Sequence, residues 1–416
     1  MKTEVLTHPG QINPAAWNAL LARQRTPTPF MRHEYLAALH DSGSAVPATG
    51  WTPRFVLLWR GGELAAACPL YLKSHSWGEY VFDFAWARAY AEHGLAYYPK
   101  ALVAVPFTPV PGSRLLAMDG AARAALVQAL LALCRAEGWP SLHLLFGDAD
   151  DIAACRAAGL MTRQTVQFHW QNTAGWPDFD AFLASLSQDK RKKIRQARRK
   201  VLHDAGVRFR WARGGAIAPQ DWAFFYRCYQ RTYLEHGNAP YLTPAFFAHM
   251  AQALPQPWVL FIAEQAGQPV ACSLIAVDDA AAHAGREPVA WGRYWGALAR
   301  VDSLHFEACY HQPIEWCLAH GVTRFEGGAQ GEHKMARALL PVTTHSAHWL
   351  AHPAFASAVQ DFLAREDAGM AHYMNHLRQR TPFKADAHLP EPGDNMQGHA
   401  GPAAISSPPK DGFHTR

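Results

Sequence analysis

The sequence predicts an α/β (α+β) protein made of two tandem domains, each with a mixed central sheet flanked by helices. At 416 residues the chain is too long for one ordinary core. Several helix-like patterns end in a glycine, such as Gly138, Gly159 and Gly206, and an apolar or β-rich run follows each of them. Glycine past a helix end supplies the left-handed cap, and alternating helices and strands are typical of layered α/β folds.

An internal repeat indicates two copies of one fold. Residues 56–70 (VLLWRGGELAAACPL) and 260–274 (LFIAEQAGQPVACSL) both read strand, glycine turn, strand, with Cys68 opposite Cys272. Three further matches keep the same order: 29–31 with 240–242, 77–80 with 291–294, and 93–95 with 320–322. We therefore expect a first domain at 1–174, a second at 175–385, and a disordered tail at 386–416.

Hydrophobic periodicity gives the expected elements inside each domain. In the first domain we expect helices at 123–137 and 150–158 and strands at 141–146 and 161–170. In the second domain we expect helices at 183–201, 221–236 and 305–319. The aromatic stripe of the 221–236 helix is more typical of core than of a stacking surface. Pro313, inside the last helix, indicates that this helix bends or begins there.

The charge distribution and the cysteines indicate the compartment in which the protein works. The net charge is +5, but residues 190–200 (KRKKIRQARRK) hold eight basic residues and no acidic one, which leaves the remainder at −3. The seven cysteines form no CxxC pair, which favours a reducing compartment. No secretory signal and no apolar run of the ~18 residues that span a membrane are visible. We expect a cytoplasmic protein.

Residues 289–342 concentrate the candidate functional groups, and their loop at 326–342 reads EGGAQGEHKMARALLPV. Together with the repeat and the basic helix, this loop resembles the FemAB-like acyltransferases, which carry two GNAT-like domains in tandem. The resemblance covers residues 26 to about 383 and is greatest to the branch described as peptidoglycan biosynthesis or recognition proteins. It implies a bacterial acyltransferase. The best-understood relatives move an amino acid from aminoacyl-tRNA onto the peptide stem of a cell-wall precursor.

Acyl transfer to an amine needs a neutral amine, a held carbonyl and stabilisation of the developing oxyanion. The family carries a lysine at the reacting carbonyl, and the resemblance assigns this place to Lys334; the alternative is a lysine on a surface loop. A leaving hydroxyl needs a proton, which Lys334 or His333 would supply. The candidate bases are Glu326, Glu332, His305 and Glu307. Glu307 has the alternative of a solvated helix face.

Aromatic and charged residues of the expected strand near 291–295 could line a substrate groove, because a strand alternates its faces. Alternatively, its tryptophans are core and Arg293 is an exposed ion-pair partner. The candidate substrate-binding residues are Trp291, Arg293, Tyr294, Trp295 and Arg337, with Trp77, Glu79, Tyr80 and Asp83 as the expected equivalents in the first copy. The resemblance would place a sugar–phosphate group near Tyr97, Tyr98, Lys100 and Arg114.

The acyl donor is expected to be a co-substrate, aminoacyl-tRNA or acyl-CoA, and no bound cofactor or metal is expected. The candidate donor-binding residues are Lys190, Arg191, Lys192, Lys193, Arg195, Arg198 and Arg199. Residues 191–195 match the basic-x-x-Ile-basic form of the family helix. This basic surface fits tRNA phosphates, simple solvation or an anionic membrane. The stretch 297–304 (ALARVDSL) lacks the glycine turn that binds pyrophosphate in acetyl-CoA-dependent relatives.

The resulting hypothesis is an N-acyltransferase that acts on an amine of a cell-wall precursor or another amino-bearing metabolite. An acyl-CoA-dependent N-acetyltransferase is one alternative, and a non-catalytic module that binds a cell-wall peptide is another. His345, His348 and His352 have a helical spacing that could suit zinc, but they occupy a strand-like stretch.

Overall fold

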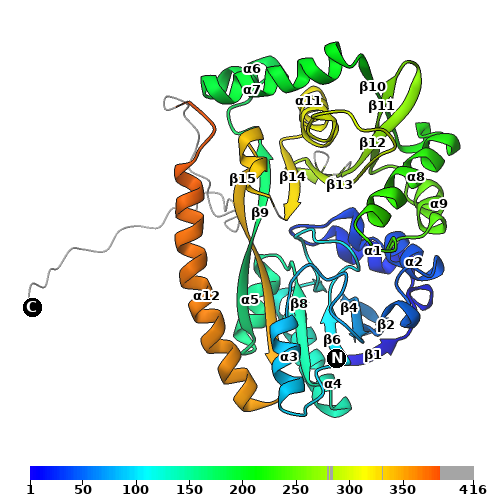
Figure 1. Cartoon of the computed structure of the whole chain (residues 1–416). Coiled ribbons are helices and arrows are strands. Elements are labelled where there is room, and N and C mark those ends of the chain that lie inside the picture. Colours follow the sequence, from blue (N-terminus) through cyan, green and yellow to red (C-terminus); the bar gives the residue numbers. More distant parts are fainter. Residues whose placement is uncertain (279–280, 282–283, 330, 385–416) are drawn as a thin grey trace, which may run out of the picture.

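The computed structural model describes residues 1–384 apart from 279–280, 282–283 and 330, so the tail predicted at 386–416 lies outside the described residues. The chain forms two halves, one above the other in Figure 1. The first half contains β1 (Lys2–Leu6), α1 (Pro14–Ala22), α2 (His33–Asp41), β2 (Trp51–Pro53), β3 (Phe55–Arg60), β4 (Glu63–Cys68), β5 (Leu70–Lys73), α3 (Phe84–Glu92), β6 (Lys100–Val103), β7 (Leu116–Ala117), α4 (Gly120–Glu137), β8 (Ser141–Leu145), α5 (Ala149–Ala157) and β9 (Met161–Gln171). The second half contains α6 (Phe179–Ser185), α7 (Gln188–Arg199), β10 (Val207–Arg213), α8 (Pro219–Glu235), α9 (Pro244–Ala253), β11 (Trp258–Gln265), β12 (Gln268–Val277), β13 (Val289–Ala297), α10 (Leu304–Phe306), α11 (Gln312–Ala319), β14 (Arg324–Ala329), β15 (Leu340–Leu350) and α12 (Pro353–Gln379).

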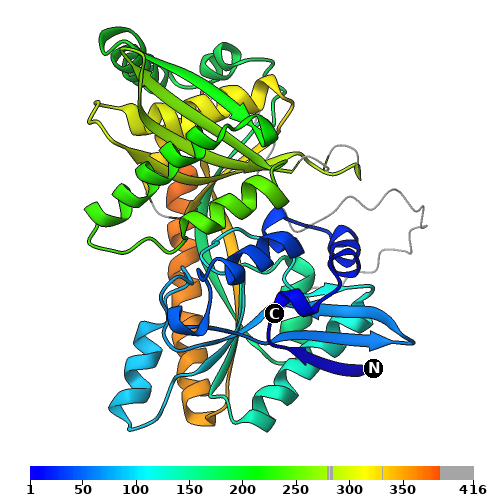
Figure 2. The ribbon, with the colours of Figure 1, turned by 90° about the vertical axis from the view of Figure 1, so that its right-hand side faces the viewer.

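Strands of both halves form one mixed sheet of eleven strands, in the order β10-β11-β12-β13-β14-β9-β15-β8-β6-β5-β2. Two pairs in this sheet run parallel, β13 with β14 and β6 with β8, and the other neighbours are antiparallel. A smaller sheet, β1-β3-β4-β7, belongs to the first half. Helices flank the sheet strands in both halves (Figure 2). The predicted α/β fold is therefore confirmed.

Each half gives its last strand to the other half. β9, the last strand of the first half, pairs with β14 of the second, and β15, the last strand of the second half, pairs with β8 of the first. The two exchanged strands also pair with each other, from Leu340 opposite His169 to His348 opposite Met161. The long helix α12 runs along both of them (Figure 1). The middle of the molecule is thus built by both halves together.

The internal repeat is confirmed for its hairpins and wrong for a later match. β3–β4 and β11–β12 are the two expected antiparallel hairpins, and Cys68 and Cys272 occupy their second strands. Trp291 and its neighbours lie in β13, whereas Trp77–Tyr80 form a loop before α3. The topological counterpart of β13 is β6, because each is the first strand of the parallel pair in its half. The Trp-Gly pair shared by residues 77–80 and 291–294 made a loop and a strand look equivalent in the sequence.

The single helix predicted at 183–201 is wrong: α6 ends at Ser185 and α7 begins at Gln188, because Leu186 and Ser187 have extended backbones. The predicted helices at 221–236 and 305–319 are confirmed. α7 buries Ile194 and exposes basic residues, and a π-helical turn at Lys200–Asp204 extends it. In α8 the aromatic stripe is core, since Trp222, Phe225 and Tyr229 are buried. The helix from Leu304 to Ala319 passes through a π-helical turn at Glu307–His311 just before Pro313. The wider turn accommodates a proline, which cannot donate a backbone hydrogen bond.

One apolar cluster joins the halves. The ring of Phe30 in the first half packs edge-on against Trp258 and Trp291 in the second, with ring centroids 6.4 and 5.6 Å apart. Tyr35 packs in the same way on Phe246, at 5.3 Å. Burial of large aromatic rings contributes strongly to such contacts, so this cluster fixes how the halves face each other. No helix among the described residues is both long and apolar enough to cross a membrane.

Candidate active site

The strands β13 and β14 separate in the middle of the molecule. They pair in parallel from Val289 opposite Arg324 to Trp291 opposite Glu326, and no further. β14 then slips against β9 between Glu326 and Ala329, and Gly328 has a φ of 74°, which favours glycine. Bulges of this kind often re-aim side chains beside active sites, and ligands of α/β sheets bind at the carboxyl ends of strands. The separation point is therefore the candidate active site.

Glu326 lies at this point with its carboxylate turned toward the first half. It is buried, and Arg324 Nε lies 3.3 Å from its Oε1. Oε2 has no well-formed hydrogen bond among the described residues; His169 Nε2 lies 3.9 Å from it, and the Trp291 side chain acts on the carboxylate as a donor. Burial raises the pKa of Glu326 to about 7, against the opposing effect of Arg324. A carboxylate with this pKa can accept a proton near neutral pH.

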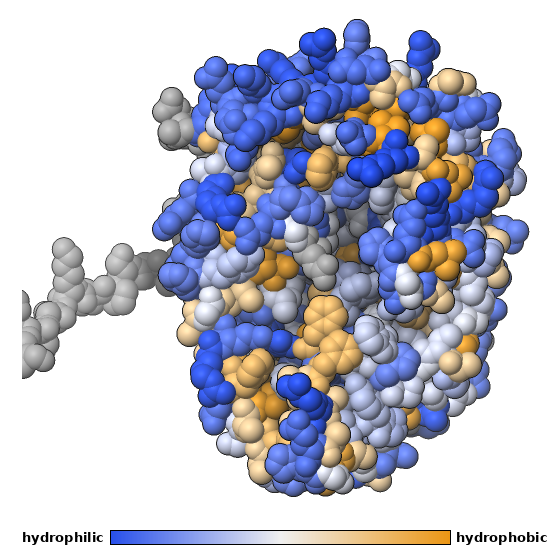
Figure 3. Space-filling view, in the orientation of Figure 1, coloured by the Kyte–Doolittle hydropathy of each residue, from blue (hydrophilic) through white to orange (hydrophobic). Residues whose placement is uncertain are grey.

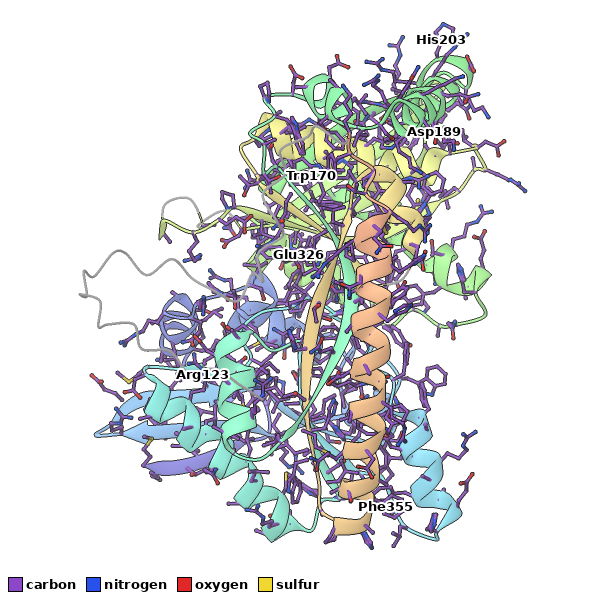
Figure 4. The ribbon with its side chains drawn as sticks, turned by 90° about the vertical axis from the view of Figure 1, so that its left-hand side faces the viewer. Arg123, Trp170, Asp189, His203, Glu326 and Phe355 are labelled. Atoms are coloured by element: carbon purple, nitrogen blue, oxygen red, sulfur yellow. The ribbon has the colours of Figure 1, made fainter. Side chains whose placement is uncertain are left out.

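A cavity of about 750 Å³ opens beside Glu326, between the two halves. Figure 4 shows Glu326 at the level where the halves meet, with α12 running alongside. The side chains and loops around the cavity come from both halves and from α12: Arg25, Thr26, Pro27, Thr28, Pro111, Gly112, Gly147, Asp148, Ala149, His169, Gln171, Asp278, Gly285, Arg286, Glu287, Val289, Trp291, Arg324, Glu326, Pro341, Val342, Thr343, Thr344, His345, Met374 and Arg378. The lining mixes both charges with hydroxyl and apolar groups, as a site for a polar organic substrate requires.

Lys334 lies on the opposite face of β14 from Glu326. A Cβ built on Gly327 would point at Leu339 and at the Lys334 side chain, and strand neighbours point to opposite faces. Lys334 Nζ donates to the carbonyl oxygens of Gly327 at 2.6 Å and Gly328 at 3.1 Å. Burial lowers the pKa of Lys334 to about 8. The ammonium thus holds the bulge from behind while Glu326 faces the cavity in front.

Replacing Lys334 with methionine should destabilise the protein, because two bulge carbonyls lose their ammonium donor. Loss of a partner by a buried polar group costs about 1–3 kcal/mol. The pKa of His305, which burial and the charges of His333, Arg337 and Lys334 lower to about 4, should rise toward its ordinary value. Urea denaturation and a proton NMR titration of His305 measure both effects. Lys334→Arg, which keeps donors and charge, is the control; an unchanged denaturation midpoint in Lys334→Met would contradict the bracing role.

Three other predicted residues gather around Lys334, namely His305, His333 and Arg337. The Arg337 guanidinium lies over the Phe306 ring at 3.5 Å, and the Phe306 and His333 rings are 6.0 Å apart. Each of the two histidine pKa values is lowered by burial and by the neighbouring cations. This face of β14 is consequently positive, a setting that suits an anionic donor group.

Two predicted bases lie elsewhere. Glu332 pairs with Arg380 Nη1 at 2.7 Å and accepts a hydrogen bond from Tyr373, so it joins the turn that carries Lys334 to the end of α12. Glu307 lies in the π-helical turn and is buried rather than solvated. Its carboxylate accepts hydrogen bonds from His311 and Gln312 and pairs with Arg198 Nε at 3.2 Å.

The predicted substrate strand divides between several environments. Trp291 is buried and lines the cavity. The Arg293 guanidinium donates to Phe107 O at 3.1 Å, across the boundary between the halves. Tyr294 packs into the shared apolar cluster, and Trp295 faces the His305 ring at 5.3 Å. Trp291 therefore touches the cavity, Trp295 joins the positive face around Lys334, and Arg293 connects the halves.

The predicted substrate-binding residues of the first half form a buried network at the amino ends of β6 and β8, away from the cavity. Lys100 Nζ donates to Ser76 Oγ and Glu79 Oε2, both at 2.8 Å, and contacts Asp83. The network continues through Tyr97, whose hydroxyl donates to Asp83 at 2.6 Å, and through Tyr98, which bonds Ser76 at 2.8 Å. Lys100 is fully buried, so direct contact with a substrate would require the surrounding loops to move.

The remaining first-half candidates are dispersed. Arg114 is buried and donates to the carbonyls of Gly112 and Val110. Trp77 is 59% exposed and packs against the Phe84 ring. The Tyr80 hydroxyl lies near Arg293, with burial raising its pKa.

His169 and Gln167 are the site residues that sequence reasoning missed. They lie in β9, which the sequence indicates only as the closing strand of the first half. The His169 side chain approaches Glu326, and Gln167 contacts His169, because β9 is exchanged into the second half, opposite β14. A His-x-Gln pair in a strand carries no signal for such an exchange.

The basic helix α7 lies on the surface at the top of Figure 1, and hydrophilic side chains cover that region in Figure 3. α7 packs against the turn Glu332–Arg337 that carries Lys334. Lys190 is half-buried, whereas Lys192 and Arg195 are exposed. Lys193 and Arg199 pair with Asp189 and Asp204, at 3.0 and 3.7 Å.

Two arginines of α7 attach this helix to neighbouring parts of the second half. Arg191 donates to the carbonyls of Ala184 and Leu186, and Arg198 pairs with Glu307 and Glu315. The exposed side chains of Lys192 and Arg195 are consequently the charges of α7 that a large partner could reach.

In the part of the chain that the structure describes, no group of three or more His, Cys, Asp or Glu side chains could hold a metal ion. His345 and His348 lie in the strand β15, as expected for that stretch, and His348 Nδ1 bonds His143 Nδ1 at 2.8 Å.

Comparisons with known proteins agree with this architecture. The profile of the FemAB-like family, described as peptidoglycan biosynthesis/recognition, matches residues 9–385. FemX is 10% identical, with 86% of this chain and 100% of that chain covered at a TM-score of 0.51. L-PGS from Bacillus licheniformis is 11% identical, with 86% and 99% covered at 0.52. The C-terminal domain of a putative lysylphosphatidylglycerol synthetase from Agrobacterium fabrum is 10% identical, with 84% and 95% covered at 0.50.

At these identities the likeness concerns the fold alone, and it agrees with the predicted mixed α/β fold. No functionally curated protein matches the chain.

Proposed function

The chain belongs to the FemAB-like family and is an acyltransferase; on that premise we propose that it transfers an aminoacyl or acyl group to an amine, with Glu326 as the general base. The acceptor class is an amine of a cell-wall precursor, which the family description supports. The reaction would take place in the cytoplasm, where the activated donors are made. The observation that carries the proposal is the buried Glu326 carboxylate, with a pKa near 7, in the wall of the cavity between the halves.

The proposed reaction assigns a separate task to each face of β14. The acceptor amine enters the cavity, loses a proton to the Glu326 carboxylate and attacks the donor carbonyl carbon, so that a C–N bond forms. The C–O bond of an ester donor, or the C–S bond of a thioester, then breaks, and the leaving atom takes the proton that Glu326 removed from the amine. The positive face around Lys334, on the other side of β14, would bind the anionic part of the donor. Exposed Arg378 at the cavity wall would bind a carboxylate or phosphate of the acceptor.

The donor that we favour is aminoacyl-tRNA. α7 carries its basic surface next to the turn that holds Lys334, and phosphate contacts dominate nucleic-acid affinity. A coenzyme A pyrophosphate would instead need free backbone N–H groups after β13. Here Leu298 N and Ala299 N both donate to Val270 O, at 2.7 and 3.4 Å, and at the start of the next helix Leu304 N donates to Val301 O at 3.2 Å.

The test supplies the full-length protein with either labelled aminoacyl-tRNA or labelled acetyl-CoA, together with a soluble cell-wall precursor that bears a free amine. Mass spectrometry of the precursor detects the transferred group. Transfer from aminoacyl-tRNA supports the proposal, whereas transfer from acetyl-CoA alone makes the enzyme a thioester-dependent N-acetyltransferase. Binding of the precursor without transfer from either donor favours the recognition module.

Reversing the charges of Lys192 and Arg195 should weaken tRNA binding and reduce its dependence on salt. Both side chains are exposed and lie three residues apart, on one face of α7. Each lost phosphate contact lowers the slope of log K against log salt by roughly 0.7–0.9. The measurement is a filter-binding titration with deacylated tRNA at several salt concentrations, comparing wild type with Lys192→Glu/Arg195→Glu.

The matched control is Lys2→Glu/Arg23→Glu, which changes the net charge equally on an exposed part of the first half. Equal tRNA binding by wild type and both variants would remove α7 from the donor site. If wild type binds anionic vesicles rather than tRNA, and only the α7 variant loses that binding, the helix is instead a membrane contact.

A further inference from the structure

We propose that His169, carried into the second half by the exchanged strand β9, is a positioning residue for Glu326. Pro109, Gln167 and His169 form a hydrogen-bonded relay that directs an N–H group at the free oxygen of the Glu326 carboxylate. The consequence for catalysis rests on the proposed function, but the relay itself is a property of the free protein.

The chemistry of Pro109 fixes the orientation of every group in the relay. Its carbonyl oxygen can only accept, and Gln167 Nε2 lies 2.8 Å from it, so the amide presents its NH₂ group there. The amide oxygen Oε1 then faces His169 Nε2 at 3.3 Å. Since Oε1 can only accept, His169 Nε2 must carry the hydrogen. The neutral ring is therefore the Nε2–H tautomer.

The same N–H group is within a short movement of Glu326. His169 Nε2 lies 3.9 Å from Glu326 Oε2, a buried oxygen with no well-formed hydrogen bond in the described part of the chain; the Trp291 side chain is the other N–H donor that acts on this carboxylate. A shift of the imidazole by roughly 1 Å would bring the pair to hydrogen-bonding distance. Such a bond to the carboxylate favours its ionised form, which is the form that accepts a proton.

The charges around His169 and Glu326 determine whether the imidazole donates a hydrogen bond or accepts a proton. Arg324 contacts the other carboxylate oxygen at 3.3 Å, Glu287 repels the ionised Glu326, and Lys334 acts on His169 from the far face of β14. Burial, followed by Arg324 and Lys334, lowers the pKa of His169 to about 3. The imidazole consequently stays neutral at working pH and serves as a hydrogen-bond donor.

The first half thereby supplies the residues that position Glu326, the proposed base in the second half. Gln167 and His169 belong to β9, and Pro109 lies in the loop whose neighbour Phe107 accepts a hydrogen bond from Arg293. The loop that meets the second half at Arg293 is thus the loop that orients the relay.

Infrared difference spectroscopy on the free full-length protein tests the relay. The carboxyl signal of Glu326, identified by its loss in Glu326→Gln, is followed against pH in each variant. In His169→Phe, which lacks the donor, the midpoint should rise by about one pH unit, because the ionised form loses its partner. In Gln167→Leu, which removes the acceptor that keeps the hydrogen on His169 Nε2, the midpoint should rise as well, by less than in His169→Phe. His169→Asn, which keeps an N–H donor, should remain nearer to wild type than His169→Phe.

The tautomer provides a second readout. A long-range proton–nitrogen NMR spectrum should show the His169 proton on Nε2, and a proton on Nδ1 would overturn the proposal. An unchanged Glu326 midpoint in a folded His169→Phe protein would overturn it as well. If His169→Phe does not fold, the sign of the shift in Gln167→Leu decides. These measurements need no substrate, so a failure to find acyl transfer would leave their outcome intact.

Discussion

Replacing Glu326 with glutamine should lower kcat/KM for acyl transfer by roughly 10²–10⁴-fold, the usual contribution of a general base. Glutamine has nearly the same shape but cannot accept the amine proton. In the wild type, kcat/KM should rise with pH through about 7 as the buried carboxylate ionises. In Glu326→Gln, this rise should vanish from the pH profile. A variant that keeps both its rate and its rise would remove Glu326 from the role of base.

Stability against pH checks that the same variant is folded. The pKa of Glu326 is raised from its ordinary value of 4.5 to about 7 in the folded protein. A raised pKa means that the stability contributed by the protonated group is present below 4.5 and is lost as pH rises through about 7. Glutamine has no such titration, so Glu326→Gln should melt at a higher temperature than wild type at pH 8. The difference should shrink toward pH 4.

Replacing Lys100 with methionine should destabilise the protein by about 3–5 kcal/mol, the cost of breaking a buried ion pair from one side. Lys100 is fully buried between Glu79 and Asp83, and its removal leaves two carboxyl groups with little access to water. Burial already raises the pKa of Glu79 to about 7 with Lys100 in place. Urea denaturation at pH 8, where both carboxylates are ionised, measures the loss.

The control for this prediction removes the charges together. Lys100→Met/Glu79→Gln/Asp83→Asn should recover much of the lost stability, because the two buried carboxylates are then removed together with their ammonium partner. A single Lys100→Met variant as stable as wild type would mean that water reaches the network. A raised KM of the folded variant would instead support a substrate contact by Lys100.

The hairpins, the helices and the basic face of α7 were predictable because local periodicity determines them. The aromatic stripe of α8 is core for the same reason, since residues three and four apart share one face. The Trp-Gly match at Trp77 and Trp291 misled, because an identical dipeptide occurs in a loop in one half and a strand in the other. Glu326 could be named because the stretch 326–342 concentrates ionisable groups.

The partners of Glu326 could not be named from the sequence. His169 comes from a strand that leaves its own half, and pairing between strands so far apart in the chain depends on the global topology. Likewise, the sequence indicates Lys334 as a reactive group but not that it braces the carbonyls of Gly327 and Gly328. Local patterns predicted which residues carry charge, and only the three-dimensional contacts showed what each charge meets.

The exchange of β9 and β15 has a consequence for synthesis on the ribosome. β15 occupies the place between β8 and β9, and it is made near the end of the folded chain. A nascent chain that has not passed residue 340 therefore holds two unpaired strand edges, which are templates for association with other chains. The reaction centre forms only when this late strand closes the gap. Premature stop codons before β15 should thus yield aggregating fragments, rather than a smaller working enzyme.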